Sequence, residues 1–379
     1  MVAMFVCVFA TTVSVGQVAT SAYFMDQRLI NPAVTTSRSV FGLSLQLKKQ
    51  TETDHVLDLV DSSIDVSTTV ETVDINNSFQ AGPFNCEVNL APQSGLKVTD
   101  TVSVAQSALG SKSFSSKVSF VPIQLAMGYR SSSDIKYGIK LLYTSFNLSD
   151  LSMYSYGTSS ATITVDYDGL FSGNFLVFAP GILYEIKNTG ISFGYVADIY
   201  QFDQKQSSNS MQTQKTSSMS MTTNENTNSQ DKVTVKKDIL GVGYFQKIGQ
   251  NKSIRLDLSF EKMPPISRSD YFTNGELSRV VAELNLSIFR LGIESTLKKG
   301  FYVDPYNLVP FLYNQGKSFN ESVSEISFFG GFKTQKGHGL GAFYSASSAT
   351  VQERSESFES FQKIERKSSK INLSYSYVY

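Results

Sequence analysis

The chain has 379 residues, and its 33 basic residues balance its 33 acidic residues. A zero net charge argues against a nucleic-acid binder, because such proteins need a basic surface, so we expect no nucleic acid among the partners. Charged residues make up only 17% of the chain, and beyond the amino terminus no apolar run approaches the ~20 residues of a membrane-spanning helix.

The amino terminus is expected to be a secretory signal peptide, residues 1–16. It carries no charged residue, its apolar part is too short to span a bilayer, and Ser14-Val15-Gly16 places small residues where a signal peptidase binds. Cleavage after Ala22 is the second choice, and a short buried strand is the alternative. Residues 17–38 then form a short periplasmic or lumenal segment.

From Ser39 onward the dominant sequence period is two, in segments of roughly 10 to 13 residues, as in membrane-spanning strands. In one segment Ile254, Leu256, Leu258 and Phe260 alternate with polar residues, so all its charges share one face. The pattern predicts twelve strands, at residues 39–48, 117–130, 134–146, 171–186, 190–203, 235–247, 253–262, 276–287, 290–302, 323–333, 338–350 and 368–379.

Short and long connections alternate between these strands, which is typical of outer-membrane barrels. The short turns are 131–133, 187–190, 249–252 and 334–337, and the long connections are 49–116, 147–170, 204–234, 263–275, 303–322 and 351–366. We expect 49–116, which is acidic in its first part, and 204–234, which is rich in Ser, Thr, Asn and Gln, to be long extracellular loops. Alternating stretches within 49–116 leave room for one more hairpin, which would raise the count to fourteen.

The carboxyl terminus carries the most specific pattern of the chain. Apolar and aromatic residues fall on every second position up to the last residue, at Ile371, Leu373, Tyr375, Tyr377 and Tyr379. This end resembles the recognition strand by which bacterial outer-membrane barrels are selected for insertion. In a soluble β-sandwich, the alternative, it would be an exposed and aggregation-prone edge.

These patterns together predict an all-β fold over residues 39–379, with the 27 Phe and 19 Tyr residues supplying apolar positions. The expected fold is a transmembrane antiparallel up-and-down β-barrel of twelve to fourteen strands, with long extracellular loops and short periplasmic turns, in the bacterial outer membrane. Its partners would be outer-membrane lipid and lipopolysaccharide, and the barrel-assembly machinery.

The lumen-facing positions are the candidate functional site. The charged residues expected to line the lumen are Lys136, Lys140, Arg255, Asp257, Glu261, Arg279 and Glu283. Opposite charges on neighbouring strands pair with each other, so these residues form either a stiffening charge ladder or a binding site.

Little else in the sequence suggests chemistry. Two histidines and two cysteines cannot build a three-His zinc site or a disulfide framework, so we expect no metal and no cofactor. His338 lacks the serine two positions later that outer-membrane phospholipases have, since Leu340 stands there. The glycines around it open an alternating strand and not a helix, which excludes a dinucleotide site. We therefore expect the protein not to be an enzyme, with an outer-membrane hydrolase as the less favoured alternative.

Five short motifs, in this order, resemble the long-chain fatty-acid transporter (FadL-type) barrels. They are Asn31-Pro32-Ala33, Ala179-Pro180-Gly181-Ile182-Leu183-Tyr184, Ile191-Ser192-Phe193-Gly194, Arg290-Leu291-Gly292-Ile293-Glu294 and Phe301-Tyr302-Val303-Asp304-Pro305. The resemblance implies a fourteen-stranded barrel that passes hydrophobic molecules through a lateral opening, with an amino-terminal plug. Residues 17–38 are too short for that helical plug, so the expected function is passive uptake of small hydrophobic solutes in general.

The expected mature start also resembles the barrel component of the type IX secretion machinery. The residues concerned are 17–33, with Tyr23 and Leu29 to Ala33. This second resemblance implies a structural or secretion-associated barrel, which is the alternative function.

Overall fold

The structure is a computed structural model. It describes residues 31–34, 40–56, 62–103, 112–129, 134–158, 161–216, 219–250, 252–263, 275–300, 317–334, 337–355 and 362–378. The expected signal peptide lies outside this part of the chain. Within it, no helix is both long enough and apolar enough to cross a membrane.

One 3-10 helix, η1, precedes fifteen strands. Their bounds are η1 Pro32–Val34, β1 Val40–Val56, β2 Ser62–Ala81, β3 Phe84–Leu90, β4 Gln93–Ser103, β5 Lys112–Tyr129, β6 Ile135–Thr158, β7 Ala161–Glu185, β8 Ile191–Thr216, β9 Ser220–Gly249, β10 Lys252–Met263, β11 Gly275–Leu286, β12 Phe289–Lys299, β13 Lys317–Lys333, β14 His338–Ser355 and β15 Gln362–Val378.

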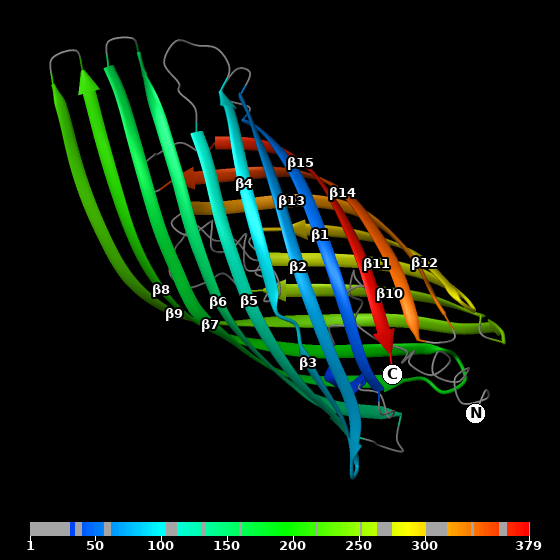
Figure 1. The fold of residues 1–379 in the computed structure, drawn as a ribbon. Helices are drawn as coiled ribbons and strands as arrows, with labels where there is room; N and C mark the ends of the chain where they lie inside the picture. The colour runs from blue at the N-terminus through cyan, green and yellow to red at the C-terminus, as the bar shows by residue number, and fades with distance from the viewer. Residues whose placement is uncertain are drawn as a thin grey trace.

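The strands form one closed antiparallel barrel. β1 pairs with both β2 and β15, which closes the sheet, and Figure 1 shows β1 and β15 side by side. β3 and β4 both lie between β2 and β5, because they are successive halves of one wall strand interrupted at Ala91 and Pro92. Fifteen segments therefore make fourteen wall strands. The predicted all-β, up-and-down barrel is confirmed, and the count is the upper value of the expected range.

Along the strands the side chains alternate so that apolar ones face outward to lipid and charged ones face inward. On β10, Leu256, Leu258 and Phe260 are 46%, 53% and 41% exposed, whereas Arg255 and Asp257 are each 2% exposed. A soluble sandwich buries its apolar face and places charges in water, and this barrel does the opposite. The exposed apolar residues of most strands lie in the half nearest the short turns, where they form an outer apolar belt.

The connections differ from the expectation. Residues 49–116, expected as a long loop, hold the end of β1, all of β2, β3 and β4, and the start of β5. Residues 204–216 and 220–234 are the paired ends of β8 and β9, which extend beyond β10 in Figure 1. The prediction of long loops was wrong for these two stretches. Strand ends outside lipid satisfy their backbone groups by pairing with each other, so they form without apolar alternation. The described acidic residues of this stretch, Glu52, Asp54, Asp65, Glu71 and Asp74, thus lie on the paired strands β1 and β2.

Candidate functional site: the inner wall of the barrel

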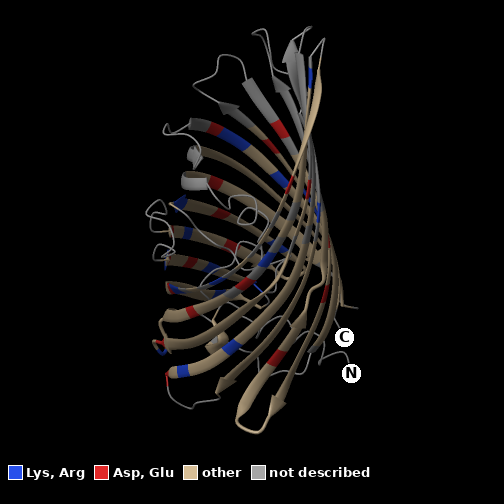
Figure 2. Ribbon diagram, turned by 90° about the vertical axis from the view of Figure 1, so that its left-hand side faces the viewer, with Lys and Arg blue, Asp and Glu red and all other residues tan. Residues whose placement is uncertain are grey.

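The predicted lumen-lining residues lie on the inward face of their strands. Lys140, Arg255 and Glu261 are each 2% exposed. Asp257 and Glu283 are similarly buried, while the side chains of Lys136 and Arg279 are 33% and 13% exposed. Figure 2 shows charges of both signs distributed over many strands of the barrel.

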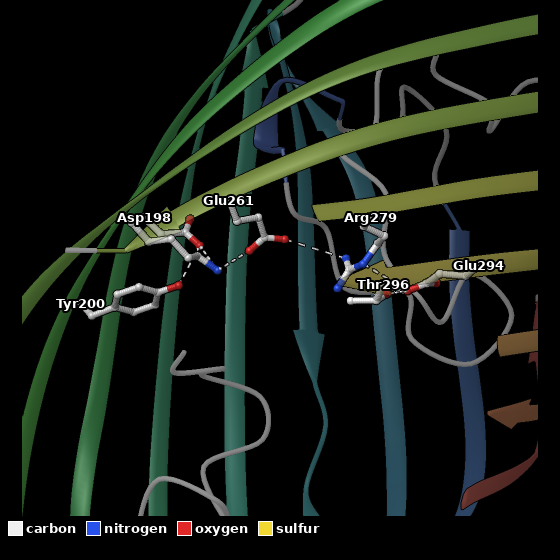
Figure 3. A network of polar contacts seen from close by, with 7 residues as sticks. Asp198, Tyr200, Glu261, Arg279, Glu294 and Thr296 are labelled. Atoms are coloured by element: carbon white, nitrogen blue, oxygen red, sulfur yellow. Dashed lines mark hydrogen bonds and ion pairs between the residues drawn. The ribbon is translucent and has the colours of Figure 1, made fainter. Parts of the chain in front are cut away.

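Six of the inward side chains form a continuous chain of ion pairs from β6 to β12, which we call the charge belt. Its members in order are Lys140, Asp198, Lys237, Glu261, Arg279 and Glu294. Figure 3 shows the part from Asp198 to Glu294. Sign alternates at each step, so three cations face three carboxylates and the belt has no formal net charge.

The first half of the charge belt centres on two lysines. Lys140 Nζ lies 3.7 Å from Asp198 Oδ1, and Lys237 Nζ lies 3.5 Å from Asp198 Oδ2. Lys237 Nζ also donates to Glu261 Oε2 at 3.1 Å. The hydroxyl of Tyr200 donates to Asp198 Oδ2 at 3.1 Å, and the Tyr200 ring lies 5.6 Å from Lys237 Nζ, a cation–π distance. Asp198 is thereby held from three sides.

The second half is built around one arginine. Arg279 Nη1 lies 3.9 Å from Glu261 Oε1, and Arg279 Nε lies 3.1 Å from Glu294 Oε1. Thr296, which stands directly opposite Arg279 on β12, donates its hydroxyl to the same Glu294 oxygen at 3.0 Å. Buried charges are tolerated only when they are paired and hydrogen-bonded, and each belt residue is ion-paired.

Further ion pairs extend this pattern over the inner wall. Lys136 Nζ lies 2.7 Å from Glu185 Oε2, and Lys370 Nζ lies 3.2 Å from Glu325 Oε2. The remaining pairs join Arg255 to Asp257 on one strand and Arg290 to Glu283 across a turn, with Asn285 donating to Glu283. The wall is thus lined by matched charges.

Sequence reasoning placed three belt members on the inward face and omitted three. Asp198, Lys237 and Glu294 were omitted, although the same alternation rule indicates their orientation. Asp198 has the parity of the inward Ser192 and Gly194 on its strand. The pairing itself could not be read from the sequence, because it depends on strand register.

A second feature of the inner wall is a docked segment of the amino-terminal region, residues 31–34. The Asn31 side-chain amide donates to the Ile182 carbonyl at 3.0 Å, and Asn31 Oδ1 accepts from the Ala33 amide at 3.0 Å. Ala33 packs with Ala126 and Leu183 in a small buried cluster. This motif, which contributed to the family resemblance, therefore anchors the chain to β5, β6 and β7.

Two glycines make room for this segment. Gly138 of β6 and Gly181 of β7 are opposite each other in the sheet. A Cβ on Gly138 would overlap the backbone of Pro32, and a Cβ on Gly181 would lie 2.5 Å from Asn31 Oδ1. Only residues without a side chain allow the segment to lie directly on the wall.

The third feature is the interruption of the third wall strand between β3 and β4. The Ala91 amide donates to the Pro122 carbonyl and the Val73 amide donates to the Pro92 carbonyl, both at 3.1 Å. Paired residues of this kind normally exchange two hydrogen bonds, but a proline has no N–H and each pair keeps only one. Two neighbouring positions of the wall, one on each side of the third strand, therefore lack a ladder hydrogen bond.

The terminal strand β15 lies between β14 and β1. Ile371, Leu373 and Tyr375 are 51%, 54% and 39% exposed and face outward. Tyr377 is half-buried and its ring centroid lies 4.8 Å from that of His338, while Tyr379 lies outside the described residues. The hydroxyl of Tyr375 is 2.7 Å from His338 Nδ1. His338 thus contacts aromatic side chains at the barrel rim and has no serine two positions further on.

A closed antiparallel barrel with an outer apolar belt and inward-facing charges defines a class. The protein is a β-barrel of the bacterial outer membrane.

Comparison with solved structures gives the fold more specifically. The Pseudomonas putida toluene transporter TodX superposes with a TM-score of 0.62 at 10% identity, over 92% of this chain and 93% of TodX. The Ralstonia pickettii toluene transporter TbuX gives 0.52 at 10% identity, over 96% and 95%. A Pseudomonas aeruginosa FadL homologue gives 0.51 at 8% identity, over 92% of each chain. No family model and no curated protein sequence matches the chain. The expected likeness to the FadL-type barrels is thus confirmed for the fold.

Proposed function

We propose that this protein is an outer-membrane channel for the passive uptake of small hydrophobic solutes. The observation that carries the proposal is the combination of a FadL-type barrel with a wall strand that is interrupted inside the outer apolar belt, at Ala91 and Pro92. Two of the solved barrels it resembles in fold are described as toluene transporters. In this proposal the protein acts as a channel, like the solved barrels that it resembles in fold.

The route we propose runs sideways through the wall at the interruption. Pro92 and Pro122 each remove one ladder hydrogen bond there, so separating the strands costs less than elsewhere in the sheet, by about 1 kcal/mol for each missing bond. Leu90, Val121 and Ile123 stand on the outward side of this point, where they face lipid. A hydrophobic solute would then pass from the lumen into the bilayer without entering water.

The inward-facing charges and the terminal strand have separate roles in this proposal. The predicted set from Lys136 to Glu283 lines the lumen and, by pairing with opposite charges on the wall, stiffens it. The terminal strand, with Ile371, Leu373 and Tyr375 outward, is the segment that the barrel-assembly machinery recognises. Lipid and lipopolysaccharide surround the outer apolar belt.

Uptake by cells tests the function directly. Cells that lack the protein and cells that express it are supplied with labelled toluene, and initial uptake is measured after the cells are de-energised. Expression is expected to raise the uptake of toluene and to leave the uptake of a polar sugar of similar size unchanged. Equal toluene uptake in both strains would reject the proposed function.

A further inference from the structure

The pairing of the inward charges bears on which hydrophobic solutes can enter. Seven of the inward-facing cations of the described wall lie against seven carboxylates close to the charge belt or on the strands beside it. The pairs join Lys136 to Glu185, Lys140 and Lys237 to Asp198, Lys237 and Arg279 to Glu261, Arg279 to Glu294, Arg255 to Asp257, Arg290 to Glu283 and Lys370 to Glu325. None of these cations is free to take an anionic ligand.

Two additional carboxylates lie on the inner wall next to the interruption. Asp74, opposite the interruption on β2, accepts hydrogen bonds from Gln46 at 2.8 Å and from Asn89 at 3.4 Å. Glu87 of β3 is 7% exposed and accepts from Asn76 at 3.4 Å. A negatively charged solute on its way to the interruption would therefore meet carboxylates and amides.

We infer that the channel admits uncharged hydrophobic solutes and rejects carboxylates of the same chain length, and that Asp198 and Glu261 of the charge belt set this selectivity. The inference rests on the proposed function and deepens it, because it separates neutral hydrocarbons and alcohols from fatty acids as substrates.

The physical reason is the cost of a carboxylate in this interior. An ion that leaves water must find a compensating charge or hydrogen-bond donors. At the centre of the charge belt it could do so by displacing Glu261 from Lys237 and Arg279, or Asp198 from Lys140 and Lys237. Each displaced residue is itself 4% exposed or less, so the exchange leaves one buried carboxylate without its cation. A neutral solute makes no such demand.

The belt also predicts how the selectivity can be changed. Glu261→Gln keeps the shape and removes one negative charge, which leaves Lys237 and Arg279 with Asp198 and Glu294 and a surplus of one positive charge. Arg279→Gln produces the opposite surplus. The matched control is Glu225→Gln, the same substitution on the exposed part of β9 that extends beyond β10.

The test compares 1-decanol with decanoate at neutral pH, where the acid is ionised. Initial uptake of each labelled compound is measured in de-energised cells that express the wild type, Glu261→Gln, Arg279→Gln or Glu225→Gln. We expect the wild type and Glu225→Gln to take up the alcohol at least ~10-fold faster than the carboxylate, and Glu261→Gln to raise carboxylate uptake about 10-fold, which corresponds to one charge-assisted contact. In Arg279→Gln, where the surplus charge is negative, we expect the uptake of decylammonium to rise instead of the uptake of decanoate.

Each outcome decides a different claim. Equal uptake of decanol and decanoate by the wild type overturns this inference and leaves the proposed function standing. Uptake of neither compound rejects the proposed function. If Glu261→Gln does not assemble, as shown by loss of the shift between boiled and unboiled samples on a denaturing gel, Asp198→Asn takes its place. If a folded Glu261→Gln or Asp198→Asn variant still excludes decanoate, the charge belt does not set the selectivity.

Discussion

The fit of the amino-terminal segment against the wall leads to a sharp prediction at Gly138. In Gly138→Ala the new methyl group would overlap the backbone of Pro32, which cannot move aside as a flexible side chain can. The segment must therefore leave the wall. It loses the hydrogen bond from Asn31 to the Ile182 carbonyl and the burial of Pro32 and Ala33.

The size of the effect follows from these contacts. One hydrogen bond contributes about 1 kcal/mol, and the apolar groups of Pro32 and Ala33 contribute roughly 1–2 kcal/mol on burial. Docking should therefore weaken by about 2–3 kcal/mol, which is roughly a 30- to 150-fold change in the docked-to-undocked ratio.

Thiol labelling measures this ratio. Ala33 is 5% exposed, so a cysteine placed there reacts with a water-soluble reagent mainly when the segment is undocked. Ala33→Cys is combined with Cys86→Ala, because Cys86 is a free buried thiol. The control is Gly330→Ala, whose new methyl group meets the flexible end of Leu291 at 3.2 Å and the Arg290 carbonyl at an ordinary contact distance of 3.9 Å. Similar labelling rates in Gly138→Ala and Gly330→Ala would refute the reasoning.

Three further predictions concern stability and assembly. Gly190→Ala and Gly82→Ala both place a side chain at positive φ, but only at Gly190 does the new atom overlap a backbone carbonyl. Denaturant unfolding in vesicles should therefore show a loss of unfolding free energy of about 1–2 kcal/mol for Gly82→Ala and a clearly larger loss for Gly190→Ala. Leu258→Lys on the outer apolar belt should lose ~2–4 kcal/mol, whereas Glu225→Lys beyond the belt should change the unfolding free energy by less than ~0.5 kcal/mol. Tyr375→Ser should reduce the amount of heat-modifiable barrel recovered from outer membranes, and unchanged recovery would remove that residue from the insertion signal.

The sequence predicts the fold wherever lipid constrains it. A strand that crosses the bilayer must alternate apolar and polar residues, and Ile254 to Glu261 shows the pattern that the structure confirms. Outside the bilayer this constraint ends. Residues 204–230 carry no alternation, yet the stretches 204–216 and 220–230 form paired ends of β8 and β9, because two aligned backbones satisfy each other without any apolar face.

The charge belt shows the corresponding limit for the site. The inward direction of Lys140 follows from alternation, but its partner Asp198 comes from β8, with β7 between them. Lys140 stands opposite Ala179 on β7, and this small side chain leaves space for the lysine to reach across. Such a contact depends on the register between strands and on the size of a neighbouring side chain. Neither can be read from the alternation pattern of a single strand.

The interruption was hidden in the sequence for a similar reason. Prolines at positions 92 and 122 are visible, but only the register places Pro122 opposite Ala91 and Pro92 opposite Val73. The two missing donors then fall on either side of one strand.

A reversible lock on this part of the wall tests the central claim most directly. Leu90 and Ile123 are partners across β3 and β5 beside the interruption, so Leu90→Cys with Ile123→Cys, in a Cys86→Ala background, can form a disulfide that holds the strands together. Leu258→Cys with Val280→Cys, partners across β10 and β11, is the control lock.

Labelled toluene uptake is then measured in the same cells before and after reduction. A lateral route at the interruption predicts that the oxidised Leu90–Ile123 lock abolishes the uptake due to the protein, that reduction restores it, and that the control lock has no effect. Uptake that is the same in the oxidised and reduced states of the Leu90–Ile123 pair would contradict the account.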